Sequence, residues 1–148
     1  MTTGTTKTLE EVQIKQLIGN WTKAVRAKDI KGVMACYAPG IVSFDMIPPL
    51  QFTGTEEYRE NWEQGFTMCN MFDIEFRDMT ITAGEEVGYC HRLNRMTGTM
   101  NDGTKFDTWV RWTACFRKIN GKWLITHEHI SVPMDMESGK ALQDLKPE

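Results

Sequence analysis

The stretch from Phe106 to Ser131, FDTWVRWTACFRKINGKWLITHEHIS, decides the fold class of this chain. Aromatic and β-branched residues dominate both of its halves, and such residues are typical of strands. Between the halves, Asn120-Gly121 can supply the positive φ angles of a tight hairpin turn. The stretch therefore predicts two antiparallel strands, over residues 106–118 and 122–131.

The same two-residue period continues upstream. Apolar and charged residues alternate from Phe72 to Arg77, and a second alternating run extends from Val87 to Arg95 after a turn at residues 83–86. Asn101-Asp102-Gly103 predicts a further turn before the stretch described above. Together these runs indicate a long antiparallel meander.

The first half of the chain has a helical period. Thr8-Leu9-Glu10-Glu11 has the pattern of a capping box and opens a helix over residues 8–27. Asp29 is placed to cap a second helix, which includes Tyr37 and stops at Pro39-Gly40. Thr55 can cap a third. Helices followed by a meander predict an α+β fold, with three N-terminal helices on one face of a curved sheet.

The length of 148 residues and the 41% apolar content predict one domain over residues 1–148. Its expected core covers residues 8–132. Residues 133–148 have weak periodicity and form a C-terminal tail that we expect to cross the sheet or to be partly mobile.

Composition also excludes several classes of partner. The net charge is −3 and no basic cluster occurs, so nucleic acid is not an expected partner. No apolar run reaches the ~18 residues that span a bilayer, and the start MTTGTTKTLEEV lacks the features of a signal peptide. The four cysteines form no C-x-x-C pair; they are Cys36, Cys69, Cys90 and Cys115. Their spacing favours free thiols over a metal site, and free thiols predict a cytoplasmic location.

Several short motifs resemble one protein family. They are Trp21, Lys28-Asp29-Ile30, Tyr37-Ala38-Pro39, Asp45, Gly54, Trp62, residues 108–113 (TWVRWT), residues 120–125 (NGKWLI) and residues 127–131 (HEHIS). Together they resemble the SnoaL-like proteins of the cystatin-like α+β cone superfamily, which also includes ketosteroid isomerase, the polyketide cyclases, nuclear transport factor two and the kinase association hub. The resemblance implies a cone-shaped barrel of a strongly curved mixed or antiparallel sheet, closed by the helices around a deep pocket. It also implies homodimers and chemistry without a cofactor.

Ketosteroid isomerase aligns with residues 21–54 without a gap. This alignment implies that Asp45, which stands in the apolar run IVSFDMIPPL, is the general base. Trp21 stands at the position of the tyrosine donor, and Thr113 at that of the protonated aspartic acid. Neither residue is as strong a hydrogen-bond donor to an oxyanion, so steroid isomerisation is not expected.

The alternation also predicts which side chains face the pocket. His91 is expected inward because the opposite parity, Gly88, Cys90, Arg92 and Asn94, offers little apolar bulk. The family comparison places Arg111 on the pocket face, and Glu128 as well if it shares a face with Thr126 and Ile130. A slip of one residue exchanges these faces. Our candidate catalytic residues are Asp45, His91 and Arg111, and the candidate ligand-binding residues are Trp21, Tyr37, Tyr58, Trp62, Phe66, Leu93, Arg95, Trp109, Thr113, Glu128 and Ile130.

Each of these assignments has a plain structural alternative. Asp45 could satisfy backbone amides before Pro48-Pro49, His91 could bond a carbonyl in the core, and Arg111 could serve a structural ion pair. The leading hypothesis is an acid–base enzyme that acts on an apolar small molecule, as an isomerase, cyclase, hydratase or hydrolase. The alternative is a non-catalytic module for ligand binding or assembly. We also predict a homodimer, because large residues such as Trp112 and Trp123 would need cover on the outer sheet face.

Overall fold

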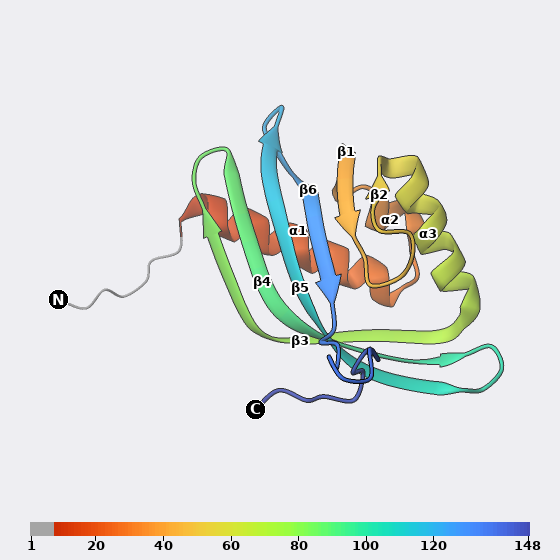
Figure 1. Cartoon of the computed structure of the whole chain (residues 1–148). Helices are drawn as coiled ribbons and strands as arrows, with labels where there is room; N and C mark the ends of the chain where they lie inside the picture. The colour runs from red at the N-terminus through yellow and green to blue at the C-terminus, as the bar shows by residue number, and fades with distance from the viewer. Residues whose placement is uncertain (1–7) are drawn as a thin grey trace.

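The computed structural model of the protein describes residues 8–148 and has the predicted α+β architecture (Figure 1). The opening helix, α1 (Leu9–Arg26), is capped as its sequence predicts, because Thr8 Oγ1 accepts a hydrogen bond from Glu11 N at 3.2 Å. One face of α1 carries Ile14, Ile18, Trp21 and Val25, all buried. This face packs along the inner surface of the sheet and forms much of the core.

The second helix is shorter than predicted. α2 (Ile30–Met34) begins after the Asp29 cap, but Tyr37 already opens the strand β1 (Tyr37–Phe44). Pro39-Gly40 therefore lies inside a strand instead of ending a helix. Proline is tolerated in a strand where the ladder is irregular, and the pairing of β1 shifts register between Tyr37 and Val42.

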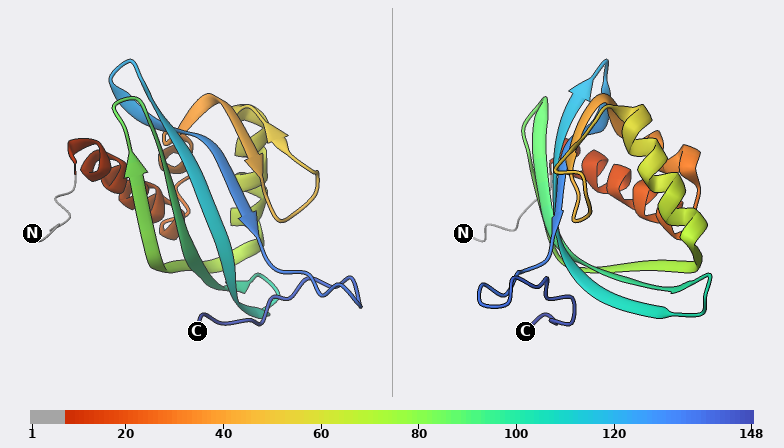
Figure 2. Two further views of the ribbon diagram at one scale, coloured as in Figure 1. Left: turned by 60° about the vertical axis from the view of Figure 1, so that its left-hand side comes forward. Right: turned by 45° about the vertical axis from the view of Figure 1, so that its right-hand side comes forward.

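The third helix, α3 (Thr55–Met68), follows the short strand β2 (Phe52–Thr53). Its N-cap is Gly54 and not Thr55 as predicted, because the cap position has a φ of 88°, which glycine adopts easily. α1 and α3 cover the concave side of the sheet, as the right-hand view of Figure 2 shows.

The predicted meander is confirmed. Its strands are β3 (Cys69–Ala83), β4 (Val87–Met100), β5 (Lys105–Ile119) and β6 (Lys122–Ser131), joined in sequence by tight turns. At the last turn, Asn120 and Gly121 have φ angles of 52° and 79°, as their sequence predicts. The sheet order is β2-β1-β6-β5-β4-β3, and the parallel pairing of β1 with β6 makes the sheet mixed.

A bulge in β6 determines which of its side chains face inward. Phe116 pairs with Ile125, but the next residue back along β5, Cys115, pairs with His127, so Thr126 is the extra residue. Trp123 and Ile125 are buried before the bulge, and Glu128 is buried after it. The bulge thus changes the parity of the strand, and it places Glu128 inside and His127 outside.

The remaining segments lie outside the sheet. Residues 132–148 leave the end of β6 and form an irregular turn, with one bridge between Met134 and Ala141 (Figure 1). This tail does not cross the sheet. Among residues 8–148, no helix is both long and apolar enough to span a membrane. Residues 1–7, which belong to the segment used to argue against a signal peptide, lie outside the described residues.

Candidate functional site

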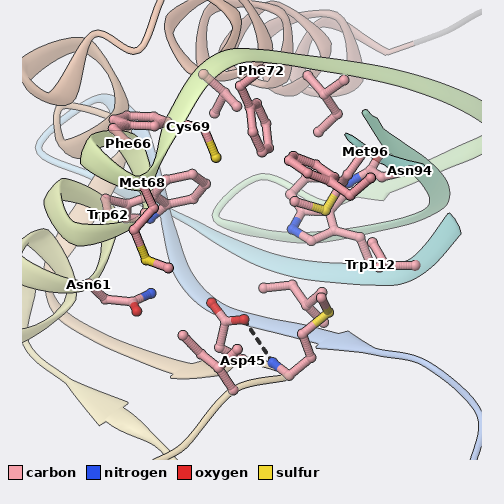
Figure 3. Close-up of a pocket in the computed structure, with 18 of the residues that line it drawn as sticks. Asp45, Asn61, Trp62, Phe66, Met68, Cys69, Phe72, Asn94, Met96 and Trp112 are labelled. Atoms are coloured by element: carbon pink, nitrogen blue, oxygen red, sulfur yellow. Dashed lines mark hydrogen bonds between the residues drawn. The ribbon is translucent and has the colours of Figure 1, made fainter. Parts of the chain in front are cut away.

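A cavity of about 360 Å³ lies between α1, α3 and the concave face of the sheet (Figure 3). Its walls are mainly apolar, and they include Trp62, Phe66, Phe72, Met96, Val110 and Trp112. Asp45, Asn61 and Asn94 are the only acid or amide side chains among the described residues that line it. An apolar pocket with a few placed polar groups is the usual form of a small-molecule site.

Asp45 lies in the cavity wall, one residue after the end of β1. Its Oδ1 accepts a hydrogen bond from Met46 N at 2.7 Å, and its Oδ2 lies 3.1 Å from Tyr58 Oη. Burial raises the pKa of this carboxyl, while hydrogen bonds from Met46, Tyr58 and Asn61 act in the opposite direction. Asp45 thus caps its own turn, as the structural alternative expected, and also presents a carboxylate with raised proton affinity to the cavity.

Glu128 is a second carboxyl beside Asp45, and it is fully buried. Its Oε1 accepts from Tyr37 Oη at 2.8 Å and lies 2.5 Å from Tyr58 Oη, while its Oε2 accepts from Trp112 Nε1 at 3.0 Å. Burial raises the pKa of Glu128 to about 6, although these hydrogen bonds lower it. Glu128 therefore titrates closer to neutral pH than an ordinary glutamate.

Tyr58 joins the two carboxyls, since its hydroxyl oxygen is within hydrogen-bond distance of both Asp45 and Glu128. A phenol has one proton to donate, so it can satisfy only one carboxylate at a time. Burial and the charge of Glu128 raise the pKa of Tyr58 well above its ordinary value, which keeps this proton in place. When Tyr58 donates to Glu128, Asp45 can complete the second contact only by being protonated and donating to Tyr58 Oη.

Tyr37 and Trp21 support this cluster from the side of α1. Trp21 Nε1 donates to Tyr37 Oη at 3.0 Å, and Tyr37 Oη donates to Glu128. The Trp21 ring stacks on Trp112 at a centroid distance of 5.2 Å and lines the cavity. The indole N–H that the alignment places at the oxyanion position is therefore engaged within the protein.

The predicted faces of β4 and β5 were wrong. Six of the predicted site residues therefore lie on the face of the sheet away from the cavity: His91, Leu93, Arg95, Trp109, Arg111 and Thr113. On that face, Arg95 forms an ion pair with Asp107 at 2.7 Å, and Arg111 Nε donates to Ser131 Oγ at 3.1 Å. The predicted grouping of His91 and Arg111 with Asp45 is corrected accordingly. Thr113 cannot act as an oxyanion donor in this cavity.

Where β4 begins, its inner face lies close to α1 and to β3. A Cβ atom at Gly88 would lie 2.8 Å from Ile14 Cδ1, so this position has no room for a side chain. The apolar bulk comes from the neighbouring elements instead, including Ile74 on β3 and Trp112 on β5. Trp112 and Trp123 are thus buried in the core, and the argument that they need cover from a second subunit was wrong.

The inner face of β4 also carries two polar residues, which the alternation pattern had predicted to face outward. Arg92 is buried, with its guanidinium carbon 4.4 Å from the Phe76 ring centroid and 4.8 Å from that of Trp112. Its Nη2 donates to Thr22 Oγ1 at 3.2 Å, and burial lowers its pKa to about 10. Asn94, two residues further, lines the cavity. Arg92 and Asn94 share one parity of the strand, so the sequence pattern identifies them as neighbours on one face but does not show that this face is the inner one.

Of the other predicted ligand-binding residues, Trp62, Phe66 and Ile130 line the cavity. Tyr37, Tyr58 and Glu128 lie behind its surface, in the hydrogen-bonded cluster that supports Asp45. The site therefore consists of an apolar chamber with an acidic cluster at one wall.

A family model described as a SnoaL-like domain matches residues 14–135. The chain belongs to this family. The SnoaL-like domain is also similar to solved structures. One is an NTF2-like protein of unknown function from Pseudomonas putida KT2440, with 41% sequence identity, a TM-score of 0.88, and coverage of 95% of this chain and 99% of that chain.

Two more distant structures share the fold of this SnoaL-like domain. A candidate scytalone dehydratase from Novosphingobium aromaticivorans has 12% identity and a TM-score of 0.78, with coverage of 95% of this chain and 96% of that chain. A ketosteroid isomerase-like protein from Erwinia carotovora atroseptica has 18% identity and a TM-score of 0.74, with coverage of 84% and 97%. At these identities the similarity establishes the fold alone. No curated protein matches the SnoaL-like domain significantly.

Proposed function

We propose that this SnoaL-like domain is a small acid–base enzyme that needs no cofactor and acts on an apolar small molecule in the cavity. The observation that carries the proposal is the position of Asp45, which faces the apolar cavity in front and contacts Tyr58 behind. A carboxylate in such surroundings has a raised proton affinity, which is the property that a general base requires.

The reaction that fits this arrangement is proton transfer next to a carbonyl group. The Asp45 carboxylate would take a proton from the carbon beside the carbonyl, and the electron pair of the broken C–H bond would move to form an enolate. In a ketone whose enolate is conjugated with a carbon–carbon double bond, return of the proton from Asp45 to another carbon of the conjugated system would complete an isomerisation. Attack of the enolate carbon on an internal carbonyl would form the new carbon–carbon bond, and transfer of the proton from Asp45 to the resulting alkoxide oxygen would complete a cyclisation. Both reactions leave the enzyme unchanged and require no other reagent.

Glu128 would act as a positioning residue, because it lies behind Tyr58 and not in the cavity wall. Its short contact with Tyr58 draws the phenolic proton away from Asp45, so Asp45 Oδ2 keeps its proton affinity. Once Asp45 has taken a proton, it can donate to Tyr58 Oη while Tyr58 still donates to Glu128. The cluster thus favours the protonated product of the transfer step.

Other activities of this fold use the same residues differently. A hydratase or hydrolase would use Asp45 to activate water instead of a carbon acid, and a non-catalytic module would bind a ligand without turnover.

A cytoplasmic location is supported by the free cysteines, of which Cys36, Cys69 and Cys90 are buried. The expected partner is a second copy of the chain.

Hydrogen–deuterium exchange tests the proposed step without knowledge of the natural substrate. A panel of cyclic and aryl ketones would first be screened for binding by quenching of tryptophan fluorescence. NMR in D₂O would then follow exchange at the carbon beside the carbonyl of each bound ketone. We expect the wild type to catalyse this exchange and Asp45→Asn to lose it.

Two features make this experiment decisive. Asp144→Asn is the matched control, since it makes the same chemical change at an exposed residue of the tail. Melting curves should show that Asp45→Asn keeps near-wild-type stability, and quenching of tryptophan fluorescence should show that it keeps ligand binding. Binding without exchange in the wild type, or full exchange in a folded Asp45→Asn protein, would contradict the assignment of Asp45 as the base.

A further inference from the structure

Asn94 is a buried amide in the cavity wall whose side chain has an unused hydrogen-bonding atom. It lies on the inner face of β4 with a side chain that is 2% exposed, and it forms part of the cavity lining. Its Oδ1 has no hydrogen-bond partner among the described residues. Figure 3 shows Asn94 beside Met96 and Trp112.

An unpartnered amide in an apolar wall has no evident structural purpose. Buried polar groups are normally hydrogen-bonded, because leaving one without a partner costs free energy. The buried Glu128 follows this rule, as it accepts from Trp112 and Tyr37. Asn94 departs from it, and so does Trp62, whose Nε1 also has no partner among the described residues; both side chains line the cavity, where a ligand could supply a partner. The amide is therefore placed to bind a ligand and not to stabilise the fold.

Asn94 and Asp45 lie on different sides of the cavity, as Figure 3 shows. The part of the sheet between them is apolar at the cavity surface and includes Val110 and Trp112 on β5 and Ile130 on β6. A molecule that meets both residues needs an apolar body with a polar group at each end. Among the described residues that line the cavity, none is cationic, and Asp45 would repel an anion, so neither polar group should be anionic. A cationic group beside Asp45 would lower the proton affinity that the proposed base needs, so both polar groups should be uncharged.

We propose that the cavity selects a neutral ring compound with two oxygen groups at opposite ends, one beside Asp45 and the other hydrogen-bonded to the Asn94 amide. An amide can donate and accept, so the distal group can be a hydroxyl or a carbonyl. The volume of about 360 Å³ is at the low end of the usual range and suits a compact ring system. This inference rests on the cavity being the substrate site of the proposed function, and it defines the substrate class.

Calorimetric binding of two matched probes tests the role of Asn94. Naphthalene-2,6-diol has an oxygen at both ends, whereas 6-methyl-2-naphthol has the same shape with a methyl group at one end. We expect the wild type to bind the diol more tightly. Asn94→Leu should weaken binding of the diol about threefold to tenfold while leaving binding of the methyl compound unchanged or tighter.

The comparison between the probes separates a direct contact from a general change in the cavity. An equal change in affinity for both probes in a folded Asn94→Leu protein would overturn the proposal. Failure of both probes to bind the wild type would contradict the size and shape assigned to the ligand. Asp45→Asn should keep the preference for the diol, because that preference depends on Asn94. A failure of the catalytic proposal can thus be distinguished from a failure of the proposed role of Asn94. The first would appear as an absence of exchange activity in the wild type, with the preference for the diol unchanged.

Discussion

Replacement of Glu128 by glutamine should change how the stability of the protein depends on pH. Burial raises the pKa of Glu128 from an ordinary 4.5 to about 6, so the folded protein holds this proton more tightly than the unfolded chain does. At about 1.4 kcal/mol for each pKa unit, the difference corresponds to about 2 kcal/mol. Glu128 is fully buried, so solvent does not screen this contribution.

The sign of the effect follows from the raised pKa. The stabilising contribution of the protonated carboxyl is fully present below about pH 4.5, and it is lost as the pH rises through about 6. Glutamine resembles the protonated form at every pH. The free energy of unfolding of the wild type, measured relative to Glu128→Gln, should therefore fall by about 2 kcal/mol as the pH rises from ~4 to ~7.5.

Equilibrium urea unfolding of both proteins over this pH range is the measurement. The exposed carboxyls Asp102, Asp107 and Asp135 have lowered pKa values and act in the opposite direction, but both proteins contain them, so the difference cancels their effect. Repeating the comparison in an Asp45→Asn background removes the neighbouring carboxyl from the titration. Parallel pH profiles of the two proteins would refute the reasoning, since they would mean that Glu128 titrates normally.

Four further predictions concern the cavity, the packing, the activity and the assembly. Asn94→Leu should raise the free energy of unfolding in urea by about 1 kcal/mol or more, because it removes an unpartnered amide, and a loss of stability would contradict that account. Gly88→Val should lower the free energy of unfolding by about 1–3 kcal/mol, because the new side chain would collide with Ile14. Gly19→Ala, on the exposed side of α1, should raise the free energy of unfolding slightly. Equal effects of the two substitutions would argue against the close approach at Gly88. A Δ5-3-ketosteroid should be turned over very slowly or not at all, since Trp21 Nε1 is bound to Tyr37 and Thr113 faces away from the cavity. Losing one oxyanion donor typically costs about a hundredfold to a thousandfold in rate. Robust turnover of the steroid would therefore be inconsistent with this site. The chain should be a homodimer, now because the outer sheet face exposes Tyr89 and Val87, and a monomeric mass in light scattering at micromolar concentration would exclude this.

The elements that depend on local rules could be predicted from the sequence. The Thr8 cap of α1 and the turn at Asn120-Gly121 each follow from residues a few positions apart. The end of α2 could not be placed in this way. Pro39-Gly40 is compatible with a helix stop and with an irregular strand, and it is the pairing of Tyr37 and Val42 with β6 that decides between them.

The inward faces of β4 and β5 could not be predicted because they depend on tertiary packing. Apolar bulk normally marks the inner face of a strand, but the inner face of β4 begins at Gly88, where Ile14 leaves no room for a side chain, and continues with the buried polar residues Arg92 and Asn94. Asp45 could be identified because it stands alone in an apolar run, and its catalytic role stays a prediction. The use of Tyr58 and Glu128 as its partners depends on the bulge in β6, which no local pattern of the sequence reveals.

That bulge divides β6 into two halves, and the alternation of inward and outward side chains in one half does not continue into the other. The half before Thr126 places Trp123 and Ile125 in the core, and the half after it places Glu128 beside the cavity. If the extra residue were accommodated beyond His129 instead, His127 and His129 would turn inward and Glu128 outward, with no change of amino acid. The identity of the titrating group at this wall, a carboxyl or an imidazole, is thus set by where one irregularity falls in the strand. Related sequences that share His127-Glu128-His129 could differ in chemistry for this reason alone, and the bulge position offers protein engineers a means to exchange the two.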